Sequence, residues 1–147
     1  MKIYEIQTKY VMVGCAKYLK KIQSPDDMNQ YMKNAFDDHI DQEQFWVILL
    51  NTENIPIARY MITLGLVNQT QIHAREAFRF AIRENAVSVI FAHNHPSGNL
   101  SPSTQDIQST QQLVNAGKLL DIQVLDHIII TDNSFYSIRN THSYLFN

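Results

Sequence analysis

Cysteine and long hydrophobic runs are the scarcest features of this sequence of 147 residues, whose single cysteine is Cys15. A lone cysteine excludes an internal disulfide and a cysteine-rich metal site, and we expect Cys15 to pack as a small apolar side chain. No apolar stretch approaches the roughly 20 residues of a membrane-spanning helix, and the first residues lack the pattern of a signal peptide. We therefore expect a cytoplasmic protein that has no membrane partner.

A strong excess of charge is also absent, because the formal net charge is -2. This balance gives no general electrostatic attraction to nucleic acid. Arg75, Arg79 and Arg83 recur at helical spacing, and a predicted helix over 73–85 would place them on one face. Such a stripe is usually a solvated surface, but it leaves a contact with nucleic acid open.

The length and the composition, with 45% hydrophobic residues, are typical of one globular domain with its own core. Residues 1–24 predict an N-terminal strand or arm, and residues 25–147 predict the domain itself. An edge strand in 1–24 would be able to pair with another chain, so the oligomeric state stays open.

Along the chain, short apolar runs alternate with segments of helical periodicity. Ser24 and Pro25 are typical of a helix start, and an apolar stripe follows as far as Phe36. Strands are expected at 44–51 and 56–65 as a hairpin, and later at 87–92, 122–130 and 135–138. A helix that begins at Ser103 is expected to end near Gly117 with a left-handed cap. This order predicts an α/β fold, with a mixed β-sheet flanked by helices.

Three potential metal ligands lie close together after the predicted strand 87–92. Residues two apart in an extended chain project to the same side, so His93 and His95 can reach one ion. Ser103 is typical of a helix N-cap, and Asp106 falls in the first turn, where the helix dipole favours a carboxylate. A His-x-His pair alone is more often a pair of surface or hydrogen-bonded histidines. The aspartate at this offset instead favours a zinc site with one open position.

The spacing of these residues resembles a known signature: His-x-His, seven residues, Ser, two residues and Asp, as in the JAMM metalloproteases. The run His-Asn-His-Pro-Ser-Gly at 93–98 resembles the RadC branch of the JAB/MPN family, and the resemblance covers about 25–137. It implies a single JAB/MPN domain with a cytidine-deaminase-like fold and one zinc ion held by His93, His95 and Asp106. It also implies hydrolysis of a peptide or isopeptide carbonyl in an unidentified substrate.

The resemblance also suggests residues that would act on the substrate. The family places a glutamate just before the strand that follows the first helix, which selects Glu43 as the general base; a solvated carboxylate is the alternative. For Glu76, on the predicted helix 73–85, a surface charge is favoured. Ser103 is expected to hydrogen-bond the developing oxyanion, and helix capping is its structural alternative.

Asp126 and His127 resemble the family's Asp-His pair before its penultimate strand. We interpret His127 as a hydrogen-bonded histidine of the sheet rather than a partner of a metal ligand, since the ion already has three ligands.

The resemblance leaves one alternative function open and excludes another. Full-length RadC proteins carry an N-terminal helix-hairpin-helix region, and too few residues precede Pro25 here to contain one. An accessory protein of DNA repair or recombination, which binds DNA or a protein partner, is the alternative function. A zinc deaminase would need His-x-Glu and Pro-Cys-x-x-Cys elements, and the sequence has neither.

Overall fold

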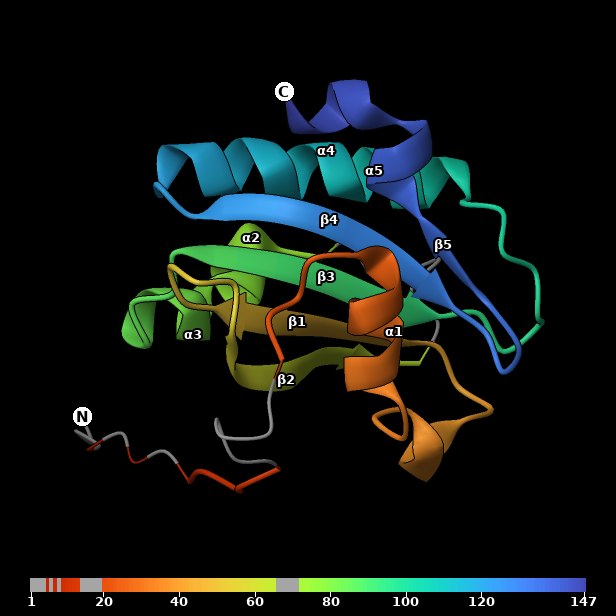
Figure 1. The fold of residues 1–147 in the computed structure, drawn as a ribbon, viewed down its shortest axis with the longest axis horizontal. Coiled ribbons are helices and arrows are strands. Elements are labelled where there is room, and N and C mark those ends of the chain that lie inside the picture. Colours follow the sequence, from red (N-terminus) through yellow and green to blue (C-terminus); the bar gives the residue numbers. More distant parts are fainter. Residues whose placement is uncertain (1–4, 6, 8, 14–19, 66–71) are drawn as a thin grey trace, which may run out of the picture.

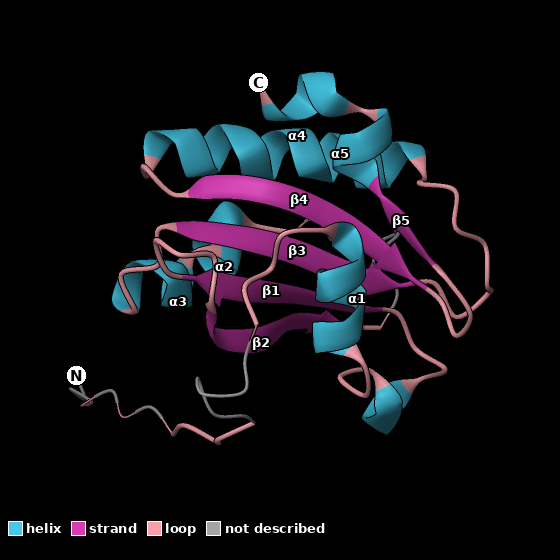
Figure 2. Cartoon of the chain, viewed as in Figure 1, coloured by secondary structure: helices cyan, strands magenta, loops and turns pink. Residues whose placement is uncertain are grey.

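A computed structural model describes residues 5, 7, 9–13, 20–65 and 72–147. Figures 1 and 2 show a twisted sheet with helices on both of its faces. The strand order is β2-β1-β3-β4-β5, and of the adjacent pairs only β3 and β4 run parallel. The predicted α/β class with a mixed sheet is therefore confirmed. In chain order the elements are α1 Pro25–Met32, η1 Asp37–His39, β1 Gln44–Leu50, β2 Pro56–Leu64, α2 Ala74–Ala77, α3 Arg79–Arg83, β3 Ser88–Asn94, α4 Thr104–Leu119, β4 Gln123–Ile130, β5 Phe135–Ser137, α5 Ile138–Thr141 and η3 Ser143–Phe146.

The two faces of the sheet have separate apolar cores, because side chains alternate along each strand. On one face, Phe45 of β1 and Phe91 of β3 pack with residues of α2, α3 and α4. On the other face, Ile48 and Ile90 pack with residues of α1. His93 follows Phe91 by two residues and therefore projects toward α4, which lies along the sheet in Figure 1. The alternation in β3 thus directs a histidine to the α4 side.

The helix α1 begins where the sequence predicts and ends earlier. Ser24 and Asp27 form a capping box, and Pro25 occupies the first helical position, as is favoured there. The helix stops at Met32, although the predicted apolar stripe continues to Phe36. Phe36 is still buried in the α1-side core, so the stripe predicts burial correctly beyond the end of the helix.

The single helix predicted over 73–85 is wrong. The structure has two short helices there, α2 and α3, and Phe78 separates them with φ -103° and ψ -1°. The hydroxyl of Tyr60 donates to the carbonyl oxygens of Glu76 and Ala77, which a continuous helix would use for its own amides. The ring of Phe78 is buried against Phe91 at a centroid distance of 5.9 Å, which holds the break against the sheet.

Gly117 does not cap α4, contrary to the prediction. The helix continues to Leu119, and Asp121 has the positive φ, 56°, of the left-handed position. The amide of Ile122 donates to the carbonyl of Gly117 at 2.9 Å, as in a Schellman motif. A Cβ atom at position 117 would lie 2.5 Å from the carbonyl oxygen of Ile122. Glycine is therefore required by close packing between α4 and the start of β4.

We expect Gly117→Ala to lower the free energy of unfolding by about 1–3 kcal/mol, because backbone atoms must shift to relieve the overlap. This cost exceeds the gain of about 1 kcal/mol that alanine brings to a helix interior. Chemical denaturation measures the change. Leu119→Ala is the control, since Leu119 lies in the same helix and is 88% exposed. Unchanged or higher stability of Gly117→Ala would contradict the packing role.

The N-terminal predictions are tested only in part. Cys15 and most of 1–8 lie outside the described residues, and Lys9 to Val13 follow no regular secondary structure. Tyr10 nevertheless contacts the body of the domain, because its hydroxyl hydrogen-bonds Glu84 at 2.5 Å. In the part of the chain that the structure describes, no helix has the length and apolar character needed to cross a bilayer.

Candidate metal centre

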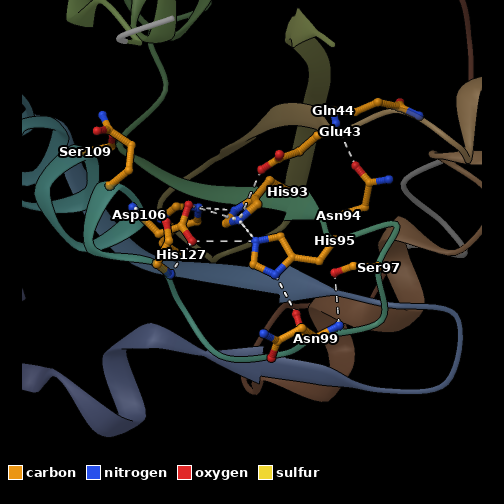
Figure 3. Close-up of polar contacts among 12 residues, drawn as sticks. Glu43, Gln44, His93, Asn94, His95, Ser97, Asn99, Asp106, Ser109 and His127 are labelled. Atoms are coloured by element: carbon orange, nitrogen blue, oxygen red, sulfur yellow. Dashed lines mark hydrogen bonds and ion pairs between the residues drawn. The ribbon is translucent and has the colours of Figure 1, made fainter. Parts of the chain in front are cut away.

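Four side chains that are far apart in the sequence meet at one end of the sheet. Glu43, His93, His95 and Asp106 each offer one ligand atom, and these atoms lie within 4.8 Å of one another. The Nε2 atoms of the two histidines are 2.9 Å apart, and Asp106 Oδ1 lies 3.3 Å from His93 Nε2. Asp106 Oδ2 lies 3.6 Å from His95 Nε2. Figure 3 shows these groups pointing at a common position, so the cluster can hold a metal ion.

Two of the three predicted ligands lie in regular elements, and the third is hydrogen-bonded to one. His93 is in β3. His95 is the first residue after β3, and its backbone amide donates a hydrogen bond to the carbonyl of Ile130 in β4. Asp106 is the third residue of α4 and part of its capping box. Its Oδ2 accepts from the Ser103 amide at 2.7 Å, while the Ser103 hydroxyl accepts from the Asp106 amide at 3.1 Å. The cap therefore fixes the carboxylate that faces the histidines.

The ring of His95 has a defined orientation. Its Nδ1 lies 2.6 Å from the carbonyl oxygen of Asn99, which can only accept, so Nδ1 carries a proton and donates. The opposite nitrogen, Nε2, faces His93 and Asp106. The hydrogen bond to Asp106 raises the pKa of His95 above its usual value, although burial opposes this. His95 thus attracts a positive charge to Nε2, whether the charge is a proton or a metal ion.

Asp106 remains ionised in this environment. Burial alone would raise the pKa of its carboxyl group, but the adjacent imidazoles of His93 and His95 and the hydrogen bond from the Ser103 amide lower it well below the usual range. Asp106 therefore offers a carboxylate to the cluster rather than a neutral acid.

Glu43 lies immediately before β1 and beside the three ligands. Its Oε1 is 3.9 Å from His93 Nε2, and the side chain is mostly buried. Burial raises the pKa of Glu43, while the nearby His93 and His95 lower it. A raised pKa moves a carboxylate toward the range in which it exchanges protons efficiently near neutral pH.

Asn94 is a residue of this site that the sequence analysis missed. Its side-chain oxygen accepts from the Gln44 amide at 2.6 Å, and its side-chain nitrogen donates to the Gln42 carbonyl at 3.0 Å. The two bonds hold the backbone on both sides of Glu43, and Figure 3 draws the first of them. Asn94 therefore ties the strand that carries the histidines to the segment that carries Glu43.

The interpretation of His127 as only a hydrogen-bonded histidine of the sheet is wrong. Its Nε2 lies 2.8 Å from His93 Nδ1, so it contacts a candidate ligand directly. The ring is fully buried, and burial lowers the pKa of His127 well below its usual value. On the other side, its Nδ1 lies 2.6 Å from the hydroxyl of Thr110. The sequence held no signal for Thr110.

The remaining predicted residues lie as follows. Ser103 caps α4, as its structural alternative requires, and its contact with an oxyanion stays a prediction. Glu76 is on α2 and is not part of the ligand cluster. The predicted stripe of arginines is divided between α2 and α3; Arg79 stacks on Phe80, and Arg83 pairs with Glu84 at 3.5 Å. A nucleic-acid contact of this stripe also stays a prediction.

A pocket of about 490 Å³ opens beside His95. It is formed by α1 and the turn after it, by residues 94–96, and by the turn 131–134 between β4 and β5. Met32 and Phe36 supply apolar surface, while Lys33 and Asp37 supply charge. A ligand in this pocket would therefore lie against His95.

Comparison with known proteins gives one consistent result. The family model described as RadC-like JAB domain matches residues 22–143. A UPF0758 protein of Desulforamulus reducens is 44% identical over 119 residues, which are 81% of this chain and 52% of the relative. Another, from Desulforudis audaxviator, is 48% identical over 101 residues, 69% of this chain and 44% of the relative. The chain therefore spans about half the length of these curated relatives.

Proposed function

The chain belongs to the RadC-like JAB domain family, and from this premise we propose that it is a zinc-dependent hydrolase of the JAMM type that cleaves a peptide or isopeptide amide. One observation carries the proposal. Two imidazole nitrogens and a carboxylate converge within 3.6 Å of one another. Groups of this kind approach so closely only with a proton or a cation between them, and a metal ion would satisfy all three at once. The cluster is therefore suited to a metal ion.

The residues present fit zinc. Zinc–ligand distances of about 2.0–2.2 Å in a tetrahedron put neighbouring ligand atoms roughly 3.3 Å apart. The two histidine Nε2 atoms are 2.9 Å apart, and they lie 3.3 Å from Asp106 Oδ1 (His93) and 3.6 Å from Asp106 Oδ2 (His95). Two histidines and one carboxylate are also a ligand set of hydrolytic zinc enzymes, which keep the fourth position open. Both the chemistry and the spacing of the donors support zinc.

When bound, zinc supplies a Lewis acid that acidifies a water molecule and polarises a carbonyl group. Within this chain, His93, His95 and Asp106 would hold the ion, and Glu43 would accept a proton at Oε1. Glu43 then donates that proton to the nitrogen of the leaving amine, so its carboxylate is regenerated. Burial, which raises the pKa of Glu43, favours the uptake of the proton.

Two other features support hydrolysis of a substrate at this cluster. In the helix cap, the Ser103 hydroxyl accepts a hydrogen bond from the Asp106 amide. The proton of the hydroxyl is therefore free to be donated to a developing oxyanion. The pocket that His95 borders offers apolar and charged surface next to the cluster, although Glu43, His93 and Asp106 do not line it.

We expect the zinc-loaded chain to cleave members of a mixed library of peptides and lysine-linked isopeptides. Mass spectrometry of new termini would identify the cleaved bonds. Removal of the metal with 1,10-phenanthroline should reduce cleavage to background, because acidified water is then lost, and added zinc should restore it. Cleavage that persists in the metal-free protein, or no metal-dependent cleavage of either bond type, would contradict the proposal.

A further inference from the structure

We infer that Thr110 acts through His127 as a positioning residue that fixes the ring tautomer of His93, so that the lone pair of His93 Nε2 faces the metal position. The importance of that lone pair rests on the proposed function. The placement of the protons follows from the hydrogen-bond geometry together with the complete burial of His127.

The chain of hydrogen bonds begins at a backbone carbonyl. The Thr110 hydroxyl lies 2.6 Å from the carbonyl oxygen of Asp106, one turn earlier in α4. A carbonyl oxygen can only accept, so the single proton of the hydroxyl is donated there. The hydroxyl therefore has only lone pairs left for its second neighbour, His127 Nδ1, at 2.6 Å. His127 Nδ1 must carry a proton and donate it.

The same logic continues to the metal ligand. His127 is fully buried, and desolvation disfavours a charged imidazole, so its second nitrogen has no proton. His127 Nε2 accordingly accepts, and its partner at 2.8 Å, His93 Nδ1, must donate. A neutral His93 that is protonated at Nδ1 has its free lone pair at Nε2. That nitrogen is the one that faces His95 and Asp106.

The ring tautomers of His93 and His95 are thus fixed by different hydrogen-bond acceptors. For His95 the acceptor is the Asn99 carbonyl, which cannot change its role. For His93 the acceptor is another imidazole, which can accept or donate according to its own tautomer. Among the described residues, the Thr110 hydroxyl is the partner that makes this imidazole an acceptor, and it does so from a buried position on the helix that also supplies Asp106. Thr110 therefore links the helix to the strand ligand without touching the ion.

A matched pair of variants tests the inference. Thr110→Val keeps the shape but removes the hydroxyl, so His127 is free to protonate Nε2 and donate to His93. His93 would then carry its own proton at Nε2, where the metal binds. We expect zinc affinity, measured by competition with a chromophoric chelator, to fall about 10–100-fold, as when other outer partners of ligands are removed. Thr110→Ser retains the hydroxyl and is expected to bind zinc nearly as tightly as the wild type.

A spectroscopic measurement keeps the test independent of the variants' folding. Long-range ¹H–¹⁵N NMR spectra of the wild-type chain should show His127 protonated at Nδ1, the tautomer that free histidine disfavours. A proton on His127 Nε2 instead, wild-type affinity in Thr110→Val, or equal losses in the two variants would overturn the inference. If the wild type itself binds no zinc, the proposed function fails. If the wild type binds zinc and Thr110→Val binds it equally tightly, only the inference about Thr110 fails.

Discussion

Glu43→Gln is expected to reduce amide hydrolysis by about 10²–10⁴-fold while zinc stays bound in a 1:1 ratio. The substitution keeps the size and the hydrogen-bonding shape of the side chain but removes its ability to accept a proton. His93, His95 and Asp106 remain, so the ion keeps its three ligands. Initial rates of cleavage and the zinc content of the same preparation measure the two effects separately.

Glu76→Gln is the matched control for this substitution. Glu76 is a second glutamate near the predicted metal ligands in the sequence, and it lies on α2, outside the ligand cluster. Its variant should keep both activity and zinc. A loss of zinc in Glu43→Gln would make Glu43 a ligand, which its distance of 3.9 Å from His93 Nε2 permits. Unchanged hydrolysis would remove it from the mechanism.

His95→Ala is expected to weaken zinc binding by more than about 100-fold, since it removes a ligand rather than an outer partner of one. Binding only to the folded state stabilises a protein, by about 2.7 kcal/mol when free ligand is at 100 times its Kd. Added zinc should therefore raise the Tm of the wild type and leave the Tm of His95→Ala nearly unchanged. Thermal unfolding with and without zinc measures the difference.

The control is His73→Ala, because His73 is exposed and its side chain does not cap α2. This variant should respond to zinc like the wild type. An equal zinc-dependent rise of Tm in all three proteins would mean that zinc binds elsewhere, and His95 would then not be a ligand.

The candidate ligands were predictable because their arrangement is local. Alternation along a strand brings His93 and His95 to one side, and a serine cap brings Asp106 into the first turn of α4. Both rules depend only on near neighbours in the sequence. The hairpin of β1 and β2 was predictable for the same reason, since its turn lies between two apolar runs.

The residues that surround the candidate ligands were not predictable, because their positions depend on contacts between distant segments. Thr110 and His127 meet only because β4 pairs with β3 in parallel, which puts His127 opposite Phe91 and under α4. The sequence alone gave no reason to choose that register. The clamp of Asn94 on the segment before β1 joins residues that are 50 positions apart.

Tertiary contacts also explain the two errors in the helices. The apolar periodicity predicts one helix over 73–85. The hydroxyl of Tyr60 in β2, however, hydrogen-bonds two carbonyl oxygens that a continuous helix would pair with its own amides. Gly117 suggested a cap by its residue type, but the nearby Ile122 carbonyl is what requires glycine. In both places a contact from another element outweighs the local preference.

X-ray absorption at the zinc edge of the purified wild-type chain tests the metal centre most directly. The predicted result is one tightly bound zinc per chain, with four light ligands at about 2.0–2.2 Å and the scattering pattern of two imidazole rings. Zinc surrounded by six oxygen atoms, or the absence of stoichiometric zinc after loading, would contradict a centre built from His93, His95 and Asp106.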